Sequence, residues 1–286
     1  MDSGAVSRWC DARRETYAAR GADRWIEIAD PRNLRMAERD AIASQCARFN
    51  LALYRFARDR NDPDALSAFA SAMGLDRRDA TLGADHRGIA RVRVVRHTRG
   101  AEMIPFTLRA LNWHTDGYYN ASHQAVHGVV MHCASPAASG GETTLLDPDL
   151  VYAAMHERSP ALVEALSHPC AMTIPAHEAE GAVVRPARTG PVFRFLDNPP
   201  RLHMRYTMRT RSIRWRPTTD TDRAVAALEE TIASLTADQV HVRFEAGEGV
   251  ICNNVLHRRS AFVDGEDDGA RRVMLRIRSF DPVANG

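Results

Sequence analysis

The sequence contains no lysine, no long apolar run and no paired cysteine motif, and the last two absences each exclude a class of protein. Without a stretch of about 18 consecutive apolar residues there is no ordinary transmembrane helix, and the charged N-terminus lacks the apolar core of a signal peptide. The five cysteines are scattered and never spaced as CxxC, which argues against a disulfide framework or a structural zinc site. We therefore expect a cytoplasmic protein without a membrane partner.

The charges are nearly balanced. All 38 basic side chains are arginines, 36 acidic residues oppose them, and the net charge is +2. With neither a basic run nor an aromatic-interleaved basic patch, we expect no nucleic-acid partner. Apolar positions in the predicted N-terminal helices leave a homo-oligomer open.

A length of 286 residues is sufficient for one well-buried core. We predict a single domain over residues 1–286, with a helical N-terminal part at about 1–88 and a β core at about 89–282. Apolar residues recur every three or four positions over 33–58, which predicts a helix. The sequence Asp62-Pro63-Asp64 begins a second helix that extends to Met73.

Short strands separated by turn residues dominate the rest of the chain. Strands are predicted over 89–95, 125–133, 143–146, 171–174, 192–196, 202–206 and 271–278, and helices over 147–158, after Pro160 and over 221–235. Alternation over 240–244, a turn at 247–249 and a following apolar run predict a hairpin and a further strand. The pattern is that of a mainly β chain with α additions.

The segment Leu111-Asn112-Trp113-His114-Thr115-Asp116-Gly117 carries the first chemical signal. Side chains alternate along a strand, so His114 and Asp116 can point to the same face. An imidazole and a carboxylate on one face can hold a single metal ion. A second histidine would complete the facial triad of non-haem iron(II) oxygenases.

His257 is a polar residue at the end of the otherwise apolar run that precedes it, and it is the candidate third ligand. After an acidic turn, the segment 271–278 places Arg272, Arg276 and Arg278 on one face of a strand. Arginines that point into a barrel are costly unless an anion pairs with them. A guanidinium binds a carboxylate with two parallel hydrogen bonds, so a dicarboxylate cosubstrate is a natural partner.

Together these segments resemble the taurine dioxygenase-type (TauD/TfdA) family of iron(II)/2-oxoglutarate-dependent oxygenases. The matching blocks are NWHTDG at 112–117, SGGETTLLD at 139–147, NNVLHRRSAF at 253–262 and RRVMLRIR at 271–278. The resemblance implies a double-stranded β-helix core, of the jelly-roll or cupin-like type, with flanking helices. It also implies Fe(II), 2-oxoglutarate and O2 as cofactor and cosubstrates.

The resemblance assigns roles to individual residues. His114, Asp116 and His257 would hold Fe(II), while Arg272 and Thr143 would bind the distal carboxylate of 2-oxoglutarate. The expected reaction is oxidation, by hydroxylation, of a C–H bond in a small anionic or amino-acid-like substrate, with succinate and CO2 as coproducts. Desaturation and related outcomes stay open.

Candidate substrate-binding residues are Asn112, Tyr118 and Arg276, with Arg205 and Arg209 as further arginines that can meet an anionic group. Arg272 has an alternative role as a surface ion-pair partner of Asp267 or Asp268. Two other kinds of protein compete with the oxygenase: a non-catalytic metal-binding β-barrel and a zinc metallohydrolase.

Overall fold

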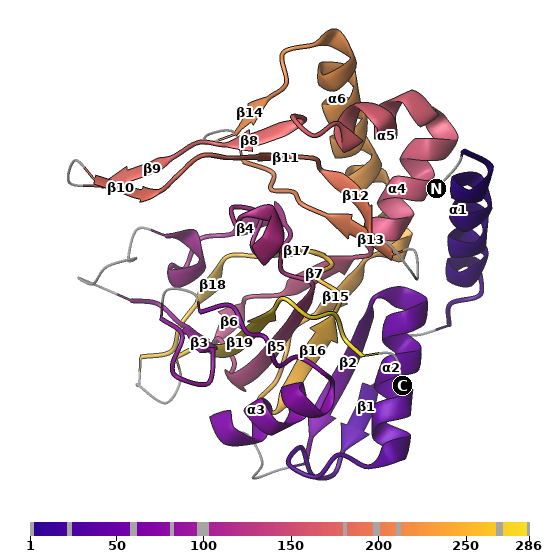
Figure 1. Cartoon of the computed structure of the whole chain (residues 1–286). Helices are drawn as coiled ribbons and strands as arrows, with labels where there is room; N and C mark the ends of the chain where they lie inside the picture. Colours follow the sequence, from indigo (N-terminus) through magenta and orange to yellow (C-terminus); the bar gives the residue numbers. More distant parts are fainter. Residues whose placement is uncertain are drawn as a thin grey trace. The chain divides into compact units, whose positions relative to one another are not determined.

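The structure is a computed structural model that describes residues 3–21, 25–57, 62–80, 83–95, 103–179, 182–196, 201–209, 213–266 and 271–284. The chain forms two compact units. The first unit comprises Met1–Gly21, Gly117–Ala125 and Leu146–Gln239, and the second comprises Ala22–Asp116, Val126–Leu145 and Val240–Gly286. Helices and strands occupy similar shares of the described residues, so the fold is mixed α and β (Figure 1).

The first unit combines helices with short antiparallel strands. Its helices are α1 (Ser3–Ala18), η2 (Ser122–Gln124), α4 (Pro148–Arg158), α5 (Pro160–Ser167), α6 (Thr219–Ser234) and η3 (Thr236–Asp238). Its strands are β8 (Met172–Ile174), β9 (His177–Ala179), β10 (Ala182–Arg185), β11 (Arg188–Gly190), β12 (Phe193–Leu196), β13 (Arg201–Met204) and β14 (Arg214–Trp215). Helix α1 packs on α4, and Tyr17 of α1 donates a hydrogen bond of 2.8 Å to Asp147, the N-cap of α4.

The second unit is built around two sheets. A six-stranded sheet has the order β1 (Trp25–Ile28), β2 (Leu51–Phe56), β16 (Glu248–Cys252), β5 (Gly128–Ser135), β19 (Val273–Ser279) and β3 (Ile89–Val92). A four-stranded sheet has the order β15 (Val240–Val242), β7 (Thr143–Leu146), β17 (Leu256–Arg259) and β4 (Leu111–His114). The pair β6 (Ser139–Gly140) and β18 (Phe262–Val263), the helices α2 (Met36–Phe49) and α3 (Pro63–Ala72), and η1 (Ile104–Phe106) complete the unit.

The strands of the six-stranded sheet bury both faces because apolar residues occupy both sets of alternating positions. In β19, Leu275 and Ile277 join a core that includes residues of α2 and α3, whereas Met274 joins a second core. This second core also contains Leu145 of β7 and Val240 of β15. Both sheets therefore contribute side chains to one apolar layer, and the helices cover the opposite face of the six-stranded sheet.

Most predicted elements are present within two or three residues of their expected bounds, including α3, α4, α5 and α6. The helix predicted over 33–58 is wrong beyond Phe49. Asn50 takes a left-handed conformation, with φ of 56°, and ends α2, after which the apolar run forms the buried strand β2. The part of the chain before residue 89 therefore supplies two strands of the main sheet as well as helices.

The hairpin predicted around residue 247 is also wrong. Strand β15 pairs with β7, whereas β16 pairs with β2 and β5, so the turn connects two different sheets. Sequence alternation locates strands but does not identify their partners, which here lie nearly a hundred residues away for β15 and more than a hundred for β16.

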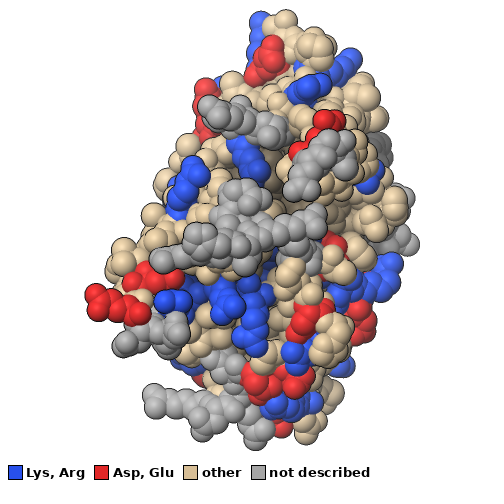
Figure 2. Space-filling model, turned by 90° about the vertical axis from the view of Figure 1, so that its left-hand side faces the viewer, with Lys and Arg blue, Asp and Glu red and all other residues tan. Residues whose placement is uncertain are grey.

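The helices of the described residues include none that is long and apolar enough to cross a membrane. Arginine and acidic side chains are interspersed on the face that Figure 2 shows, in agreement with the nearly balanced charge of the sequence.

Candidate metal centre

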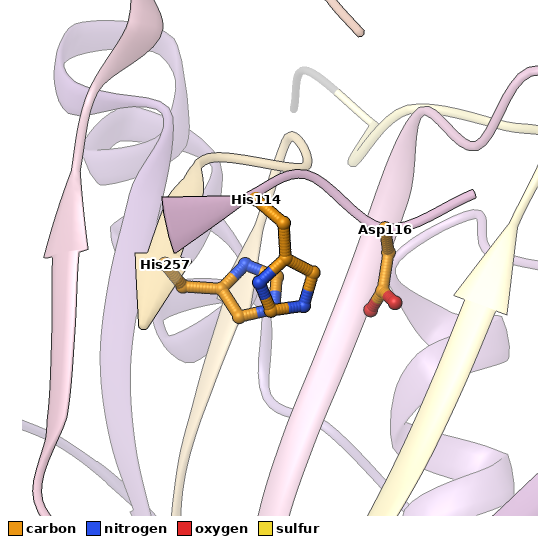
Figure 3. Close-up of side chains that lie close together, drawn as sticks. All are labelled: His114, Asp116 and His257. Atoms are coloured by element: carbon orange, nitrogen blue, oxygen red, sulfur yellow. The ribbon is translucent and has the colours of Figure 1, made fainter. Parts of the chain in front are cut away.

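Two adjacent strands of the four-stranded sheet bring together the three predicted ligands. His114 is the last residue of β4, and its Cα is paired in register with that of His257 on β17. Asp116 follows two residues after the end of β4. One potential ligand atom from each of the three residues lies within 4.8 Å of the other two, and all three residues are buried. In Figure 3 the two imidazoles lie against each other with the Asp116 carboxylate on the same side of the backbone.

Backbone carbonyls orient both imidazoles. The Nδ1–H of His114 donates to the carbonyl of Asn112 at 2.9 Å, and the Nδ1–H of His257 donates to the carbonyl of Val255 at 3.0 Å. A carbonyl only accepts, so the proton of each neutral ring lies on Nδ1 and the lone pair on Nε2. Burial, reinforced by the neighbouring His257, lowers the pKa of His114 to about 3, and burial lowers the pKa of His257. Both rings are neutral near pH 7, as metal ligands must be.

The two oxygens of Asp116 have different surroundings. Oδ1 accepts a hydrogen bond of 3.0 Å from Nη1 of Arg276 and lies 3.6 Å from Nη1 of Arg278. Burial acts to raise the pKa of Asp116, but Arg276 and Arg278 outweigh it and hold that pKa well below its usual range. Oδ2 is buried and has no hydrogen-bond partner among the described residues.

These observations test whether the residues fit a metal ion. A buried carboxylate oxygen without a partner is costly, and a divalent cation would satisfy it. Two imidazole Nε2 atoms and this oxygen form the two-histidine, one-carboxylate donor set that suits Fe(II). Metal-bound imidazoles typically donate their other ring N–H to a carbonyl or carboxylate that fixes the ring orientation, as both histidines do here. The site therefore fits a divalent transition metal.

Asn254 holds the backbone at the metal centre and was missed from the sequence. Its Oδ1 accepts from the backbone N–H of Asp116 at 2.7 Å, and its Nδ2 donates to the carbonyls of Asp116 at 2.9 Å and Val126 at 2.7 Å. Asn254 also has a positive φ of 50°, a conformation that asparagine tolerates better than most residues. The feature of the sequence that could have identified this residue is the pair Asn253-Asn254, since Asn254 lies three residues before the candidate ligand His257.

Arg272 lies beside a small cavity. It is 6% exposed, and the cavity lining includes Cys133, Gly141, Arg243 and Met274. Asp264 accepts a hydrogen bond from the backbone N–H of Arg272. The alternative partners Asp267 and Asp268 lie outside the described residues. Thr143 is buried at the start of β7, two residues after Gly141.

The candidate substrate-binding residues Asn112 and Tyr118 belong to different units of the chain. Asn112 is exposed on β4, and it is its backbone carbonyl that contacts His114. Tyr118 belongs to the first unit, where the Arg209 guanidinium lies 5.7 Å from its ring centroid. The Arg205 guanidinium donates to the carbonyls of Tyr118, Met172, Arg188 and Gly190, so its donors are engaged by backbone rather than held free for an anion.

Solved structures share this fold at low sequence identity. Asparagine oxygenase in complex with Fe(II), 3-hydroxyasparagine and succinate has a TM-score of 0.61 and 17% identity, over 98% of this chain and 92% of that one. The non-haem iron oxygenase OrfP in complex with Fe, succinate and (3S)-hydroxy-L-Arg has a TM-score of 0.63 and 16% identity, over 98% and 93%. PvcB from Pseudomonas aeruginosa has a TM-score of 0.59 and 16% identity, over 91% and 87%.

A comparison with curated proteins finds no significant match. The family model described as "Taurine catabolism dioxygenase TauD, TfdA family" matches residues 15–278. That match includes every residue of the candidate metal centre and extends through both compact units. The chain therefore belongs to the TauD/TfdA family of dioxygenases.

Proposed function

We propose that the protein is an Fe(II)/2-oxoglutarate-dependent dioxygenase that hydroxylates a C–H bond of a small molecule. The observation that carries this proposal is the buried, partnerless Oδ2 of Asp116 beside two neutral imidazoles. Family membership supports the reaction class. The structural neighbour PvcB, described as an Fe, alpha-ketoglutarate dependent oxygenase, supports the cofactors.

The residues present would hold the cofactor and cosubstrate in two places. His114, Asp116 and His257 would bind Fe(II), and Arg272 with Thr143 would bind the distal carboxylate of 2-oxoglutarate. When bound, iron, 2-oxoglutarate and O2 supply the oxidation, in which one oxygen atom enters the substrate, the other enters succinate, and CO2 leaves.

The chain's own contribution is to arrange and isolate these groups. Arg276 engages one oxygen of Asp116, which leaves a single carboxylate oxygen directed to the metal. With one ligand atom from each of three residues, His114, Asp116 and His257 would hold Fe(II) and would leave room at the ion for cosubstrate and O2. Burial of all three residues excludes water from the protein side of the metal.

We propose an anionic or amino-acid-like substrate. Two structural neighbours are oxygenases bound to hydroxyasparagine and hydroxyarginine. In this chain the guanidinium of Arg209 lies beside Tyr118 and forms no ion pair with an acidic residue among those that the structure describes. Arg276, Asn112 and Tyr118 are the proposed contacts. Only Nη1 of Arg276 bonds to Asp116, so other N–H groups of this guanidinium would bind the substrate's carboxylate while the bond to Asp116 is kept. Comparable turnover of acidic and uncharged apolar compounds in a substrate panel would contradict this assignment.

We also propose that the two sheets of the second unit form the double-stranded β-helix of the family. The shared apolar layer between them supports this architecture. Residues 1–286 would act as a single oxygenase domain, since the family match extends through both units. The partner would be a small molecule, and a cytoplasmic location and a homo-oligomer remain predictions.

Anaerobic titration with Fe(II) and then 2-oxoglutarate tests the proposed function. The expected result is a weak visible charge-transfer band that requires both additions. The band should be lost in His114→Ala and His257→Ala, and should need much more 2-oxoglutarate in Arg272→Ala. Metal binding without the band would favour the zinc hydrolase or the metal-binding barrel.

A further inference from the structure

Phe262 is the meeting point of two buried arginines. The guanidinium carbon of Arg259 lies 4.7 Å from the centroid of the Phe262 ring, and that of Arg272 lies 5.1 Å from it. Phe262, Arg259 and Arg272 are 5%, 7% and 6% exposed. The ring face is the negative part of the aromatic quadrupole, so it attracts both cations.

Neither guanidinium forms a salt bridge with a carboxylate in the part of the chain that the structure describes. Arg259 instead donates to the backbone carbonyls of Pro105, Thr107 and Arg109, in the segment that precedes β4. Burial, together with the nearby charge of Arg272, lowers the pKa of Arg259 to about 10. The carboxylate of Asp264 offsets part of the charge of both arginines. Two guanidinium groups near one carboxylate still leave an excess of positive charge in a desolvated region, which an anion would relieve.

The backbone around Phe262 requires glycine. Phe262 pairs with Gly140 across β18 and β6, where Gly140 has a φ of 68° and a Cβ would come within 2.3 Å of the carbonyl oxygen of Ala261. A Cβ on Gly141 would lie 3.3 Å from Nε of Arg272 and 3.4 Å from Cβ of Phe262. The two glycines therefore let the strand approach both the ring and the guanidinium closely.

We propose that Phe262 is a positioning residue for the anion site, where its ring fixes the Arg272 guanidinium in the orientation that receives the distal carboxylate of 2-oxoglutarate. The inference rests on the proposed function, because it takes Arg272 as the arginine that binds this carboxylate. Phe262 itself touches no reacting atom. Its effect is to limit the rotamers of Arg272 before the anion arrives, which lowers the entropy cost of binding.

Substitutions at Phe262 distinguish the effect of the aromatic ring from the effect of side-chain volume. Phe262→Leu keeps an apolar side chain but removes the quadrupole, and Phe262→Met is a second non-aromatic replacement if the leucine variant folds poorly. Phe262→Tyr retains the ring. Phe69→Leu is the matched control, because Phe69 is a fully buried phenylalanine of the same unit that packs on Tyr54 and Phe56.

The test is anaerobic titration of the Fe(II)-loaded protein with 2-oxoglutarate, together with separate measurement of the Kd for Fe(II). In Phe262→Leu we expect the Kd for 2-oxoglutarate to rise up to about tenfold, because binding would then bear the entropy cost of ordering one long side chain, Arg272. The Kd for Fe(II) and kcat at saturating 2-oxoglutarate should stay within about twofold of wild type, because the metal ligands are untouched. Phe262→Tyr should restore binding, and Phe69→Leu should lower stability without changing either Kd.

An unchanged Kd for 2-oxoglutarate in both Phe262→Leu and Phe262→Met would overturn the inference, as would equal weakening of Fe(II) and 2-oxoglutarate binding. Wild-type protein that binds Fe(II) but no 2-oxoglutarate would instead refute the proposed function. Arg272→Gln distinguishes the remaining case. If wild type binds 2-oxoglutarate and Arg272→Gln binds it equally well, the carboxylate lies elsewhere and Phe262 has no role in its binding.

Discussion

At the scale of single residues, the metal centre depends on groups that contribute no ligand atom. Asn254 is the clearest case, since its side chain fixes the backbone on both sides of the Asp116 carboxylate. A residue pattern such as HxD identifies ligands because their chemistry is distinctive. It cannot identify an asparagine that lies 138 positions away and acts through backbone hydrogen bonds. The sequence therefore predicted the three candidate ligands, which the structure brings together, but not the residue that orients one of them.

Replacement of Asn254 by alanine should lower the free energy of unfolding by about 3 kcal/mol, because three buried hydrogen bonds lose a partner. Affinity for Fe(II) should fall as well, since Asp116 loses its support. Urea denaturation and metal titration measure the two effects. Asn254→Gly accommodates the positive φ but also lacks the amide. If this variant is as stable as wild type, the hydrogen bonds contribute little and the alanine effect is backbone strain.

At the scale of elements, the short β6–β18 pair connects the glycine segment to the arginine site. Gly140→Ala should destabilise the protein by about 3 kcal/mol, because the new Cβ meets a backbone carbonyl that cannot move aside. Its KM for 2-oxoglutarate should also rise. Gly83→Ala is a matched control, since Gly83 has a φ of 81° with nothing within 4 Å of the added Cβ. Gly83→Ala should lower the free energy of unfolding by about 1 kcal/mol. If Gly140→Ala and Gly83→Ala lower it equally, the steric explanation is contradicted.

Helix α3 begins as the sequence predicted, and its N-cap provides a second prediction. The Asp62 carboxylate accepts hydrogen bonds from the backbone N–H groups of Asp64 and Ala65, both at 3.0 Å. Asp62→Ala should reduce the free energy of unfolding by about 1 kcal/mol, while Asp62→Ser should preserve most of it. Thermal denaturation checks the difference. Fe(II) affinity should not change in either variant, and a loss of metal binding in Asp62→Ala would show that α3 influences the site.

The elements that sequence reasoning misplaced share a physical cause. Strand β2 is an apolar run in which Leu53 and Phe56 continue the three- and four-residue spacing of helix α2. The boundary between helix and strand is marked by Asn50, which adopts a left-handed conformation. The strands β15 and β16 were recognised, but their partners are set by long-range packing of two apolar layers. Local patterns contain the periodicity of a strand. They do not contain the identity of the strand beside it.

At the scale of the whole molecule, the stability of the metal-free protein should depend on pH. Burial lowers the pKa of His132 to about 4, as it lowers those of the two histidine ligands. The unfolded chain binds protons near pH 6.5 that the folded chain does not bind until a lower pH. The free energy of unfolding should therefore decrease as pH falls from about 7 to about 4. Urea denaturation at several pH values measures the slope of the free energy of unfolding against pH.

Two controls identify the groups responsible for this slope. His132→Phe removes one titrating ring from the core and should make the slope shallower. Bound Fe(II) should shift the loss of stability to lower pH, because protons must then displace the metal from His114 and His257. A metal-free protein whose stability is constant between pH 7 and pH 5 would contradict the expected proton linkage.

The position of β19 has a consequence for synthesis of the chain. This strand is near the C-terminus, yet it lies between β5 and β3 in the interior of the six-stranded sheet. Until residues 273–279 leave the ribosome, β5 and β3 each present an unpaired edge, and Asp116 lacks both of its arginine partners. The proposed anion site, the arginine contacts of Asp116 and the six-stranded sheet are thus completed together by the last strand made. A chain that terminates early carries both candidate histidine ligands but neither the strand nor the arginines that complete the proposed site.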